Sequence, residues 1–308
     1  MHQPESVTII IPAFNAARFI KRAVASALQQ ANVAEVIVVD DASSDDTVEV
    51  VRSLAQEDSR VRLVRLCANV GPSAARNMAI RAATSAWIAT LDADDAFGPG
   101  RIESLLQLAR SHSAEMIADN LVYFDGRAQK ALGPSVHPEP RIQEITLEKL
   151  FRSTPDGGQD YVTLVPMINR SFLSDHAILF DEQIRNGEDF DIVARCLVAG
   201  AKYVADLAQE TYLYTSRASG TSQTVLNANV VVKQTLAWLS HPEFKKRPDR
   251  LRIVHERVEI LRRRELDRLA GDPAGPGRGA ILRLALRTPE GRRWLQDWVI
   301  ARLRPTNS

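Results

Sequence analysis

Val7-Thr8-Ile9-Ile10-Ile11 is a continuous apolar and β-branched run, and such runs are typical of a strand that is buried on both faces of a sheet. Similar runs recur along the first third of the chain, with helical spacing of apolar residues between them. The predicted strands are 7–11, 35–40, 61–66 and 87–91, and the predicted helices are 17–29, 45–56 and 72–84. This alternation predicts an α/β domain with a mainly parallel sheet flanked by helices.

The alternation loosens after residue 95. Apolar spacing predicts helices at 102–111, 147–152, 171–176 and 188–199 and strands at 116–124, 203–205 and 211–214, whereas 125–141 is polar, rich in glycine and proline, and predicted to be a loop. After about residue 225 only helical patterns remain, at 230–239, 249–269, 280–287 and 291–304, with a linker at 271–279. We therefore predict an α/β domain over residues 1–222 and a helical extension over residues 223–308.

The charge of the 308-residue chain is unevenly distributed. Residues 1–220 carry 21 Lys and Arg against 29 Asp and Glu, whereas residues 221–308 carry 18 against 9, so the net charge of +1 hides a balance of −8 and +9. The extension is thus basic, which is typical of a solvated helical face or of a surface for anionic partners. No feature indicates nucleic acid as a partner.

The chain is predicted to be cytoplasmic. Residues 1–12 lack the basic and apolar regions of a signal peptide, and no apolar run approaches the roughly 20 residues that span a bilayer. Cys67 and Cys196 are its two cysteines. They lie in segments predicted to be a buried strand and a buried helix, and a pair this sparse fits a reducing compartment rather than a disulfide framework or a zinc site.

Polar residues follow each of the first four predicted strands. They are Pro12-Ala13-Phe14-Asn15, Asp40-Asp41, Asn69-Val70-Gly71-Pro72 and Asp92-Ala93-Asp94-Asp95. Ligands bind beyond the carboxyl ends of the strands in an open parallel sheet, so these segments should converge on one site. Several carboxylates together favour a divalent cation such as Mg²⁺ or Mn²⁺, which would bridge to substrate phosphates. The alternative is that the acids only cap strands and helices.

Several common nucleotide and acyl-transfer motifs do not occur. There is no Gly-x-Gly-x-x-Gly after the first strand, no P-loop and no Gly-x-Ser-x-Gly. The sequence therefore argues against a dehydrogenase, a P-loop ATPase and a serine hydrolase.

Four motifs, in order, resemble those of family 2 inverting glycosyltransferases, whose fold is GT-A. They are the run from Val7 to Asn15, the run from Val38 to Thr47, Asn69-Val70-Gly71-Pro72-Ser73-Ala74-Ala75-Arg76-Asn77, and the Asp-x-Asp segment in Leu91-Asp92-Ala93-Asp94-Asp95. The resemblance covers about residues 5–222, and in general likeness the chain is similar to bacterial exopolysaccharide enzymes of the succinoglycan type.

The resemblance implies roles for individual residues on the donor side. Asp41 would accept a hydrogen bond from the uracil N–H, Arg76 would lie against the nucleotide, Asp92 would face ribose or bound water, and Asp94 would ligate Mn²⁺ or Mg²⁺. The remaining nucleotide-binding residues that it implies are Pro12, Phe14, Asn15, Gly71, Ala93 and Arg217. From the residues alone, Arg76 could instead be a surface arginine paired with Asp40 or Asp41.

The resemblance also points to Asp189, in the pair Glu188-Asp189 at a predicted helix start, as the base that deprotonates the acceptor. Both acids could instead only cap that helix. Arg217 belongs to a segment in which some relatives place a His or Arg against the diphosphate, and Gly220 would let that segment close. Asp119-Asn120 and the segment 156–159 are weaker candidates for the acceptor side.

The predicted function is transfer of a hexose, in particular glucose, from a UDP-sugar to a saccharide acceptor. The predicted acceptor is a lipid-linked oligosaccharide in exopolysaccharide biosynthesis. The alternatives are a sugar-nucleotide nucleotidyltransferase and a non-catalytic nucleotide-sugar-binding assembly protein. Trp294 and Trp298 follow i, i+4 spacing among arginines, so the last helix could lie peripherally on the inner membrane. Alternatively, the tryptophans pack on the protein's own helices or on a second subunit in a homodimer.

Overall fold

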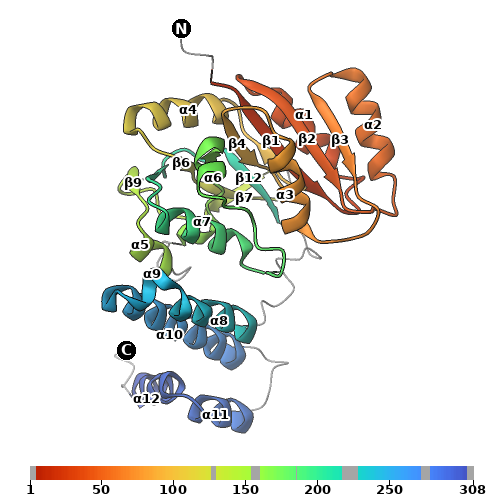
Figure 1. Cartoon of the computed structure of the whole chain (residues 1–308). Helices are drawn as coiled ribbons and strands as arrows, with labels where there is room; N and C mark the ends of the chain where they lie inside the picture. Colours follow the sequence, from red (N-terminus) through yellow and green to blue (C-terminus); the bar gives the residue numbers. More distant parts are fainter. Residues whose placement is uncertain are drawn as a thin grey trace. The chain divides into compact units, whose positions relative to one another are not determined.

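The protein is described here from a computed structural model that covers residues 5–125, 130–153, 160–184, 186–216, 228–271 and 278–303. The chain divides into two compact units, 1–224 and 225–308 (Figure 1). The first holds both sheets and the candidate site, and the second is helical. The two units are described separately below.

An eight-stranded sheet forms the centre of the first unit, in the order β3-β2-β1-β4-β10-β6-β11-β9. Its first four strands are β1 (Val7–Ala13), β2 (Val33–Asp40), β3 (Val61–Arg65) and β4 (Trp87–Thr90). They pair in parallel, as the strand–helix alternation predicts. Their carboxyl ends therefore meet at one edge, where the four polar segments lie.

Helices cover both faces of this sheet because its central strands are apolar on both sides. Val7, Ile9 and Ile11 share a core with α1 (Ile20–Leu28), α2 (Thr47–Glu57) and α4 (Arg101–His112). On the opposite face α3 (Pro72–Ala82) packs against β1 and β2 (Figure 1). The mixed α/β architecture with helices on both faces is the predicted one.

The second half of the sheet departs from the parallel pattern. β10 (Met167–Asn169) runs antiparallel between β4 and β6 (Met116–Asp119), and β9 (Ile142–Glu144) runs antiparallel to β11 (Tyr203–Asp206). β9 and β10 are three residues long, too short for periodicity to reveal them. They are held by pairing with neighbours rather than by a pattern of their own.

A second sheet has the order β5-β12-β7-β8. It contains β5 (Ala96–Phe97), β12 (Tyr212–Ser216), β7 (Leu121–Asp125) and β8 (Lys130–Pro134). The single strand predicted at 116–124 is wrong, because Asn120 divides it into β6 and β7, which belong to different sheets. The Asn120 amide donates to the carbonyls of Val136 (2.6 Å) and Leu207 (2.9 Å) and fixes this break.

Two further predictions are wrong. The predicted loop at 125–141 contains β8, which pairs with β7 across a hairpin despite its Gly and Pro content. Cys67, predicted to be buried in a strand, is exposed, because β3 ends at Arg65. Cys196 is buried in α7 (Glu188–Val198), as expected.

The helices α5 (Leu147–Phe151) and α6 (Arg170–Asp175) complete the first unit together with the 3₁₀ turn η1 (Tyr161–Thr163). The second unit contains α8 (Ala228–Ala237), the 3₁₀ turn η3 (Trp238–Ser240), α9 (Pro242–Lys245), α10 (Pro248–Gly271), α11 (Arg278–Leu286) and α12 (Pro289–Leu303). None of the helices in the described ranges is both long and apolar enough to cross a membrane.

Candidate active site

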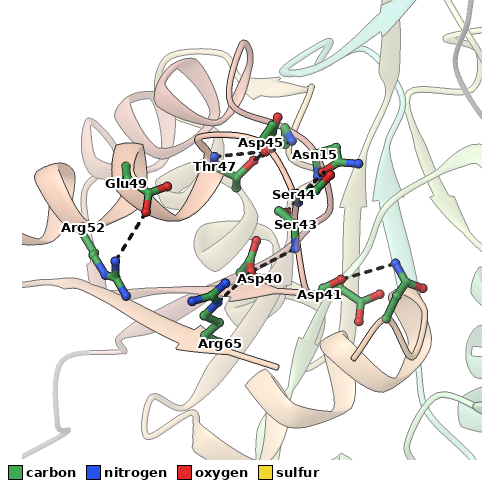
Figure 2. A network of polar contacts seen from close by, with 12 residues as sticks. Asn15, Asp40, Asp41, Ser43, Ser44, Asp45, Thr47, Glu49, Arg52 and Arg65 are labelled. Atoms are coloured by element: carbon green, nitrogen blue, oxygen red, sulfur yellow. Dashed lines mark hydrogen bonds and ion pairs between the residues drawn. The ribbon is translucent and has the colours of Figure 1, made fainter. Parts of the chain in front are cut away.

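The loops after β1 and β2 are held together by their own side chains (Figure 2). The hydroxyl of Ser43 accepts from the backbone N–H of Asn15 (2.9 Å), and the Asn15 side chain accepts in return from the N–H of Ser44 (2.9 Å). Asp45 accepts from the N–H of Ala17 (3.1 Å). Asn15 has a positive φ of 50°, which asparagine tolerates. The predicted contact between these two strand ends is therefore present.

Asp41 lies at the end of β2 and is buried. Its two carboxylate oxygens accept from the backbone N–H groups of Val70 and Gly71, each at 2.8 Å. Gly71 has φ 95° and immediately precedes α3, so a side chain there would be strained. Asp41 thus holds the third loop in place at the end of β2.

Arg76 links the donor side of the site to α7. Its guanidinium, 5% exposed, donates to Asp92 (2.9 Å) and to Glu188 (3.2 Å) and lies over the ring of Phe180. The alternative prediction for Arg76, a surface arginine paired with Asp40 or Asp41, is wrong, because Arg76 is buried and its partners are other acids. The carboxylates of Asp189, Asp92 and Glu188 raise its pKa against the effect of burial, so the cation is permanent.

The loop that follows β4 carries three carboxylates in different surroundings. Asp92 and Asp94 are partly exposed, whereas Asp95 is 1% exposed. Asp95 accepts from the phenol of Tyr212 (3.0 Å) and from the N–H of Thr215 (2.8 Å). Burial, and then the charges of Asp92 and Asp94, raise its pKa well above the usual value. Asp95 therefore joins this loop to β12 rather than facing a ligand.

Asp92 and Asp94 are the carboxylates in this loop that remain accessible. In the described parts of the chain no group of three or more Asp, Glu, His or Cys side chains could hold a metal ion by itself. Mg²⁺ and Mn²⁺ need no such cage, since one or two carboxylates with substrate phosphates and waters suffice. The residues present therefore fit a divalent ion shared with a diphosphate, which Asp94 would ligate with Asp92 beside it.

Asp189 stands in the first turn of α7, which begins after Gly187 at φ 85°. Its side chain is accessible to solvent, yet protein surrounds it closely enough for desolvation to act. Desolvation by the surrounding protein raises its pKa to about 6, Arg76 acts in the opposite direction, and the charges of Glu188 and Asp92 add to the rise. A carboxyl with this pKa is suited to accept a proton near neutral pH.

Three further predicted donor-side residues, Pro12, Phe14 and Ala93, occupy the same edge of the sheet. Pro12 is the penultimate residue of β1, Phe14 follows the strand and is 52% exposed, and Ala93 is buried between the two accessible aspartates. Arg217 and Gly220 lie outside the described residues, and so does the segment 156–159.

Asp119 and Asn120, the weaker candidates for the acceptor side, form hydrogen bonds and an ion pair in the protein interior instead. Asp119 and Arg101 form a buried ion pair (2.7 Å), and Thr211 donates to the same carboxylate. Both side chains of the Asp119-Asn120 pair are completely or nearly completely buried, so neither could contact an acceptor. Tyr212 is a site residue that was not predicted from the sequence, because the sequence around a strand tyrosine does not indicate which residue its phenol will bond.

The tryptophans of the last helix pack within the helical unit. Trp294 is 4% exposed and donates to Asp267 of α10 (2.6 Å), and Trp298 packs partly buried against the same cluster. The structure therefore favours packing on the protein's own helices over a membrane-facing role for Trp294.

Comparison with known proteins gives a consistent result. The model of Glycosyl transferase family 2 matches residues 8–176. The succinoglycan biosynthesis protein ExoU of Rhizobium meliloti is 40% identical over 205 residues, which are 65% of this chain and 59% of ExoU. ExoO of the same organism is 36% identical over 226 residues, 70% of this chain and 62% of ExoO. The chain thus spans about 60% of the length of these relatives, and the predicted succinoglycan-type resemblance is confirmed.

Solved structures agree at the level of the fold. TarS of S. aureus, residues 1–349 in complex with UDP, has a TM-score of 0.66 at 18% identity, covering 96% of this chain and 82% of TarS. The complex of the same protein with UDP-GlcNAc gives 0.65 at 17% identity, covering 96% and 80%. Together with the mixed sheet flanked by helices, this likeness confirms the predicted GT-A fold class.

Proposed function

The chain belongs to Glycosyl transferase family 2, and we propose that it transfers a hexose, in particular glucose, from a UDP-sugar to a saccharide acceptor. The transfer would invert the configuration at the anomeric carbon. The observation that carries the proposal is the Arg76 bridge. One buried guanidinium holds Asp92, beside the accessible Asp94, and Glu188, beside Asp189. A diphosphate-side acid and a candidate base thus share one site.

The donor side is formed by the loops at the carboxyl edge of the sheet. Asp41 and the backbone around Gly71 would meet the uracil, and the exposed ring of Phe14 offers it an apolar face. Asp94, with Asp92 nearby, would hold a divalent ion against the diphosphate. When bound, such an ion neutralises the charge that develops on the leaving group. The structural likeness to TarS, which was solved with UDP and with UDP-GlcNAc, supports a nucleotide-sugar donor.

In the proposed transfer step one bond to the anomeric carbon forms while another breaks. The Asp189 carboxylate takes the proton of an acceptor hydroxyl while that oxygen forms a bond to the anomeric carbon. The bond from this carbon to the diphosphate oxygen breaks, and its electron pair leaves with UDP. Because attack comes from the side opposite the leaving group, an α-linked donor gives a β-glycosidic bond. Arg76 remains charged throughout and keeps Asp92 and Glu188 in position.

The names of the relatives support the proposed acceptor class. ExoU and ExoO are named for succinoglycan biosynthesis, so we place this chain in the assembly of an exopolysaccharide on a lipid-linked oligosaccharide, at the cytoplasmic face of the inner membrane. The family match counts against a nucleotidyltransferase. A catalytically inactive binding protein is the remaining alternative. An accessible Asp189 carboxyl that can accept a proton near neutral pH argues against it.

The test is a panel of nucleotide sugars with Mn²⁺ in which binding and slow donor hydrolysis are measured, followed by transfer to oligosaccharides. We expect UDP-glucose to bind in the presence of Mn²⁺ and to be hydrolysed, with loss of turnover in Asp189→Asn and retention of UDP binding. Full activity of Asp189→Asn would remove the proposed base. UDP binding that a chelator leaves unchanged would contradict the role given to Asp94.

A further inference from the structure

One buried asparagine holds the segment of chain that leads to Asp189. Residues 178–184 belong to no helix or strand, and α7 begins soon after them with Asp189 in its first turn. Asn77 of α3 is 1% exposed. Its side-chain amide donates to the carbonyl of Phe180 (2.9 Å) and accepts from the N–H of the same residue (2.8 Å). One side chain thus satisfies both backbone groups of Phe180, as a neighbouring strand would do.

All of the hydrogen bonds of this asparagine side chain are directed at the segment. The Asn77 amide also donates to the carboxylate of Glu182 (3.0 Å), so both of its N–H groups and its oxygen have partners within the protein. Phe180 is itself buried, and the guanidinium of Arg76 lies over its ring at 5.3 Å. Asn77 is therefore not placed to bind a ligand, and it can act on the site only through the residues that it holds.

Two further side chains fix the same segment to the helices beside it. Ser73, one turn before Asn77 on α3, donates to the carbonyl of Ile184 (3.3 Å). Arg195 of α7 donates to the carbonyl of Leu179 (2.6 Å). The segment is thus bonded to both α3 and α7. Because α3 begins directly after the third donor-side loop, these bonds link that loop to the helix that carries the candidate base.

We propose that Asn77 is a positioning residue that fixes the start of α7, and with it Asp189, relative to the donor side of the site. Without Asn77 the buried N–H and carbonyl of Phe180 would lose their partner, so the segment would have to shift to recover hydrogen bonds. A displacement of about 1 Å at a reacting group can lower a rate by about 10²-fold. The inference rests on the proposed function, in which Asp189 takes the acceptor proton.

The experiment compares single and double variants in the slow hydrolysis of UDP-glucose in the presence of Mn²⁺. Asn77→Ala should lower kcat about 10- to 100-fold and leave the KM for the donor within about twofold of the wild-type value. If Asn77 acts through Asp189, the double variant Asn77→Ala/Asp189→Asn should be no slower than Asp189→Asn alone. Losses that add in the double variant would overturn the inference, because a general loss of folded protein would also add.

Asn120→Ala is the matched control. Asn120 is also completely buried and forms the same pair of bonds with Val136, whose carbonyl accepts at 2.6 Å and whose N–H donates at 3.1 Å. It should lower the free energy of unfolding while leaving kcat near the wild-type value, and an equal fall of kcat would overturn the inference. Should Asn77→Ala not fold, Asn77→Asp has the same shape and still accepts from the Phe180 N–H but cannot donate to its carbonyl. Its loss of kcat should likewise disappear in the Asp189→Asn background.

Hydrogen exchange provides a measurement that does not depend on turnover. The backbone amide of Phe180 should exchange at least about tenfold faster in Asn77→Ala than in the wild type, and at the wild-type rate in Asn120→Ala. Unchanged exchange in Asn77→Ala would overturn the inference. If the wild type turns over no nucleotide sugar, the proposed function fails, whereas faster exchange in Asn77→Ala would still show that Asn77 fixes the segment before Asp189.

Discussion

Asp189 combines access to solvent with a pKa near 6. The pKa is raised by desolvation in the surrounding protein and by the neighbouring charges of Glu188 and Asp92, and it is lowered by Arg76. A base must be ionised to accept a proton, so the reaction should slow as the pH falls through the pKa of the free enzyme. We expect kcat/KM to show an acid limb with an apparent pKa near 6 and to be about tenfold lower at pH 5 than on the plateau.

Asp189→Asn checks the assignment of that limb. An amide cannot take the proton, and loss of a general base typically lowers the rate by about 10²- to 10⁴-fold. The affinity for UDP and Mn²⁺ should remain. A residual activity that kept the same acid limb would show that another group titrates there.

Arg76 should set the pH at which the acid limb of kcat/KM falls, although it takes no proton in the reaction. Its cation lowers the pKa of Asp189, so Arg76→Gln should raise that pKa and move the acid limb to higher pH by about one unit or more. Arg76→Lys keeps the charge but cannot reach both Asp92 and Glu188 in the same geometry. It should move the limb less than Arg76→Gln while still weakening UDP binding. An unmoved limb in Arg76→Gln would contradict the electrostatic link.

The identity of these residues could be predicted from the sequence more easily than their contacts. The Glu188-Asp189 pair and Arg76 stand in recognisable motifs. The ion pair between Arg76 and Glu188 joins positions 112 residues apart, and only the packing of α3 against the segment that precedes α7 creates it. The same limit explains why Arg76 could also be interpreted as a surface residue.

At the scale of elements, β12 stabilises the loop that carries the accessible aspartates. Tyr212 and the backbone N–H of Thr215 contact this loop, and the Tyr212 phenol has both a donor and an acceptor role there. Tyr212→Phe would leave the buried Asp95 carboxylate with one partner fewer, at a cost of about 1–3 kcal/mol in unfolding free energy.

The same variant should weaken Mn²⁺ binding at the proposed site without removing the proposed ligand, Asp94. We expect Mn²⁺ affinity in the presence of UDP to fall about fivefold, or ~1 kcal/mol, as measured by the EPR signal of free Mn²⁺. Tyr161→Phe, a change at another buried tyrosine, controls for loss of a phenol elsewhere. Unchanged Mn²⁺ affinity in Tyr212→Phe would mean that Asp92 and Asp94 hold their positions without β12.

Long elements with clear periodicity were predictable, and short ones were not. β1, β2 and the helices α1 to α4 follow from runs of apolar residues at period 3.6 or from continuous burial. β5, β9 and β10 are two or three residues long, and β8 contains glycine and proline. Such strands depend on the neighbour with which they pair, and a local pattern does not contain that information.

At the scale of the whole molecule, some of the arginines of the second unit form ion pairs within that unit. Arg262 pairs with Glu290 (2.6 Å), Arg293 with Glu259 (3.6 Å), and Arg263 with Asp297. These pairs connect α10 to α12. The balance of +9 over residues 221–308 already counts these acids, so the pairs join the two helices without changing the net positive charge of the unit.

Membrane contact, if it occurs through described residues, should involve α11 rather than the buried Trp294. Leu282 and Leu286 are one turn apart and 42% and 48% exposed, and Arg283 and Arg287 are exposed beside them. Insertion of the two leucines into a bilayer interface would contribute about 1 kcal/mol each. The double variant Leu282→Gln/Leu286→Gln should therefore bind vesicles rich in phosphatidylglycerol about 20- to 30-fold more weakly.

Vesicle sedimentation at two salt concentrations measures this effect. Binding of the wild type should weaken at high salt, because arginines contribute through the surface potential of anionic lipid, whereas the loss caused by the leucine changes should persist. Val230→Gln is the matched control, since Val230 is similarly exposed on α8 of the same unit but is not beside the α11 arginines. If the double variant sediments with vesicles as well as the wild type does, α11 is not the contact, and an equal loss in Val230→Gln would mean that the effect is not specific to α11.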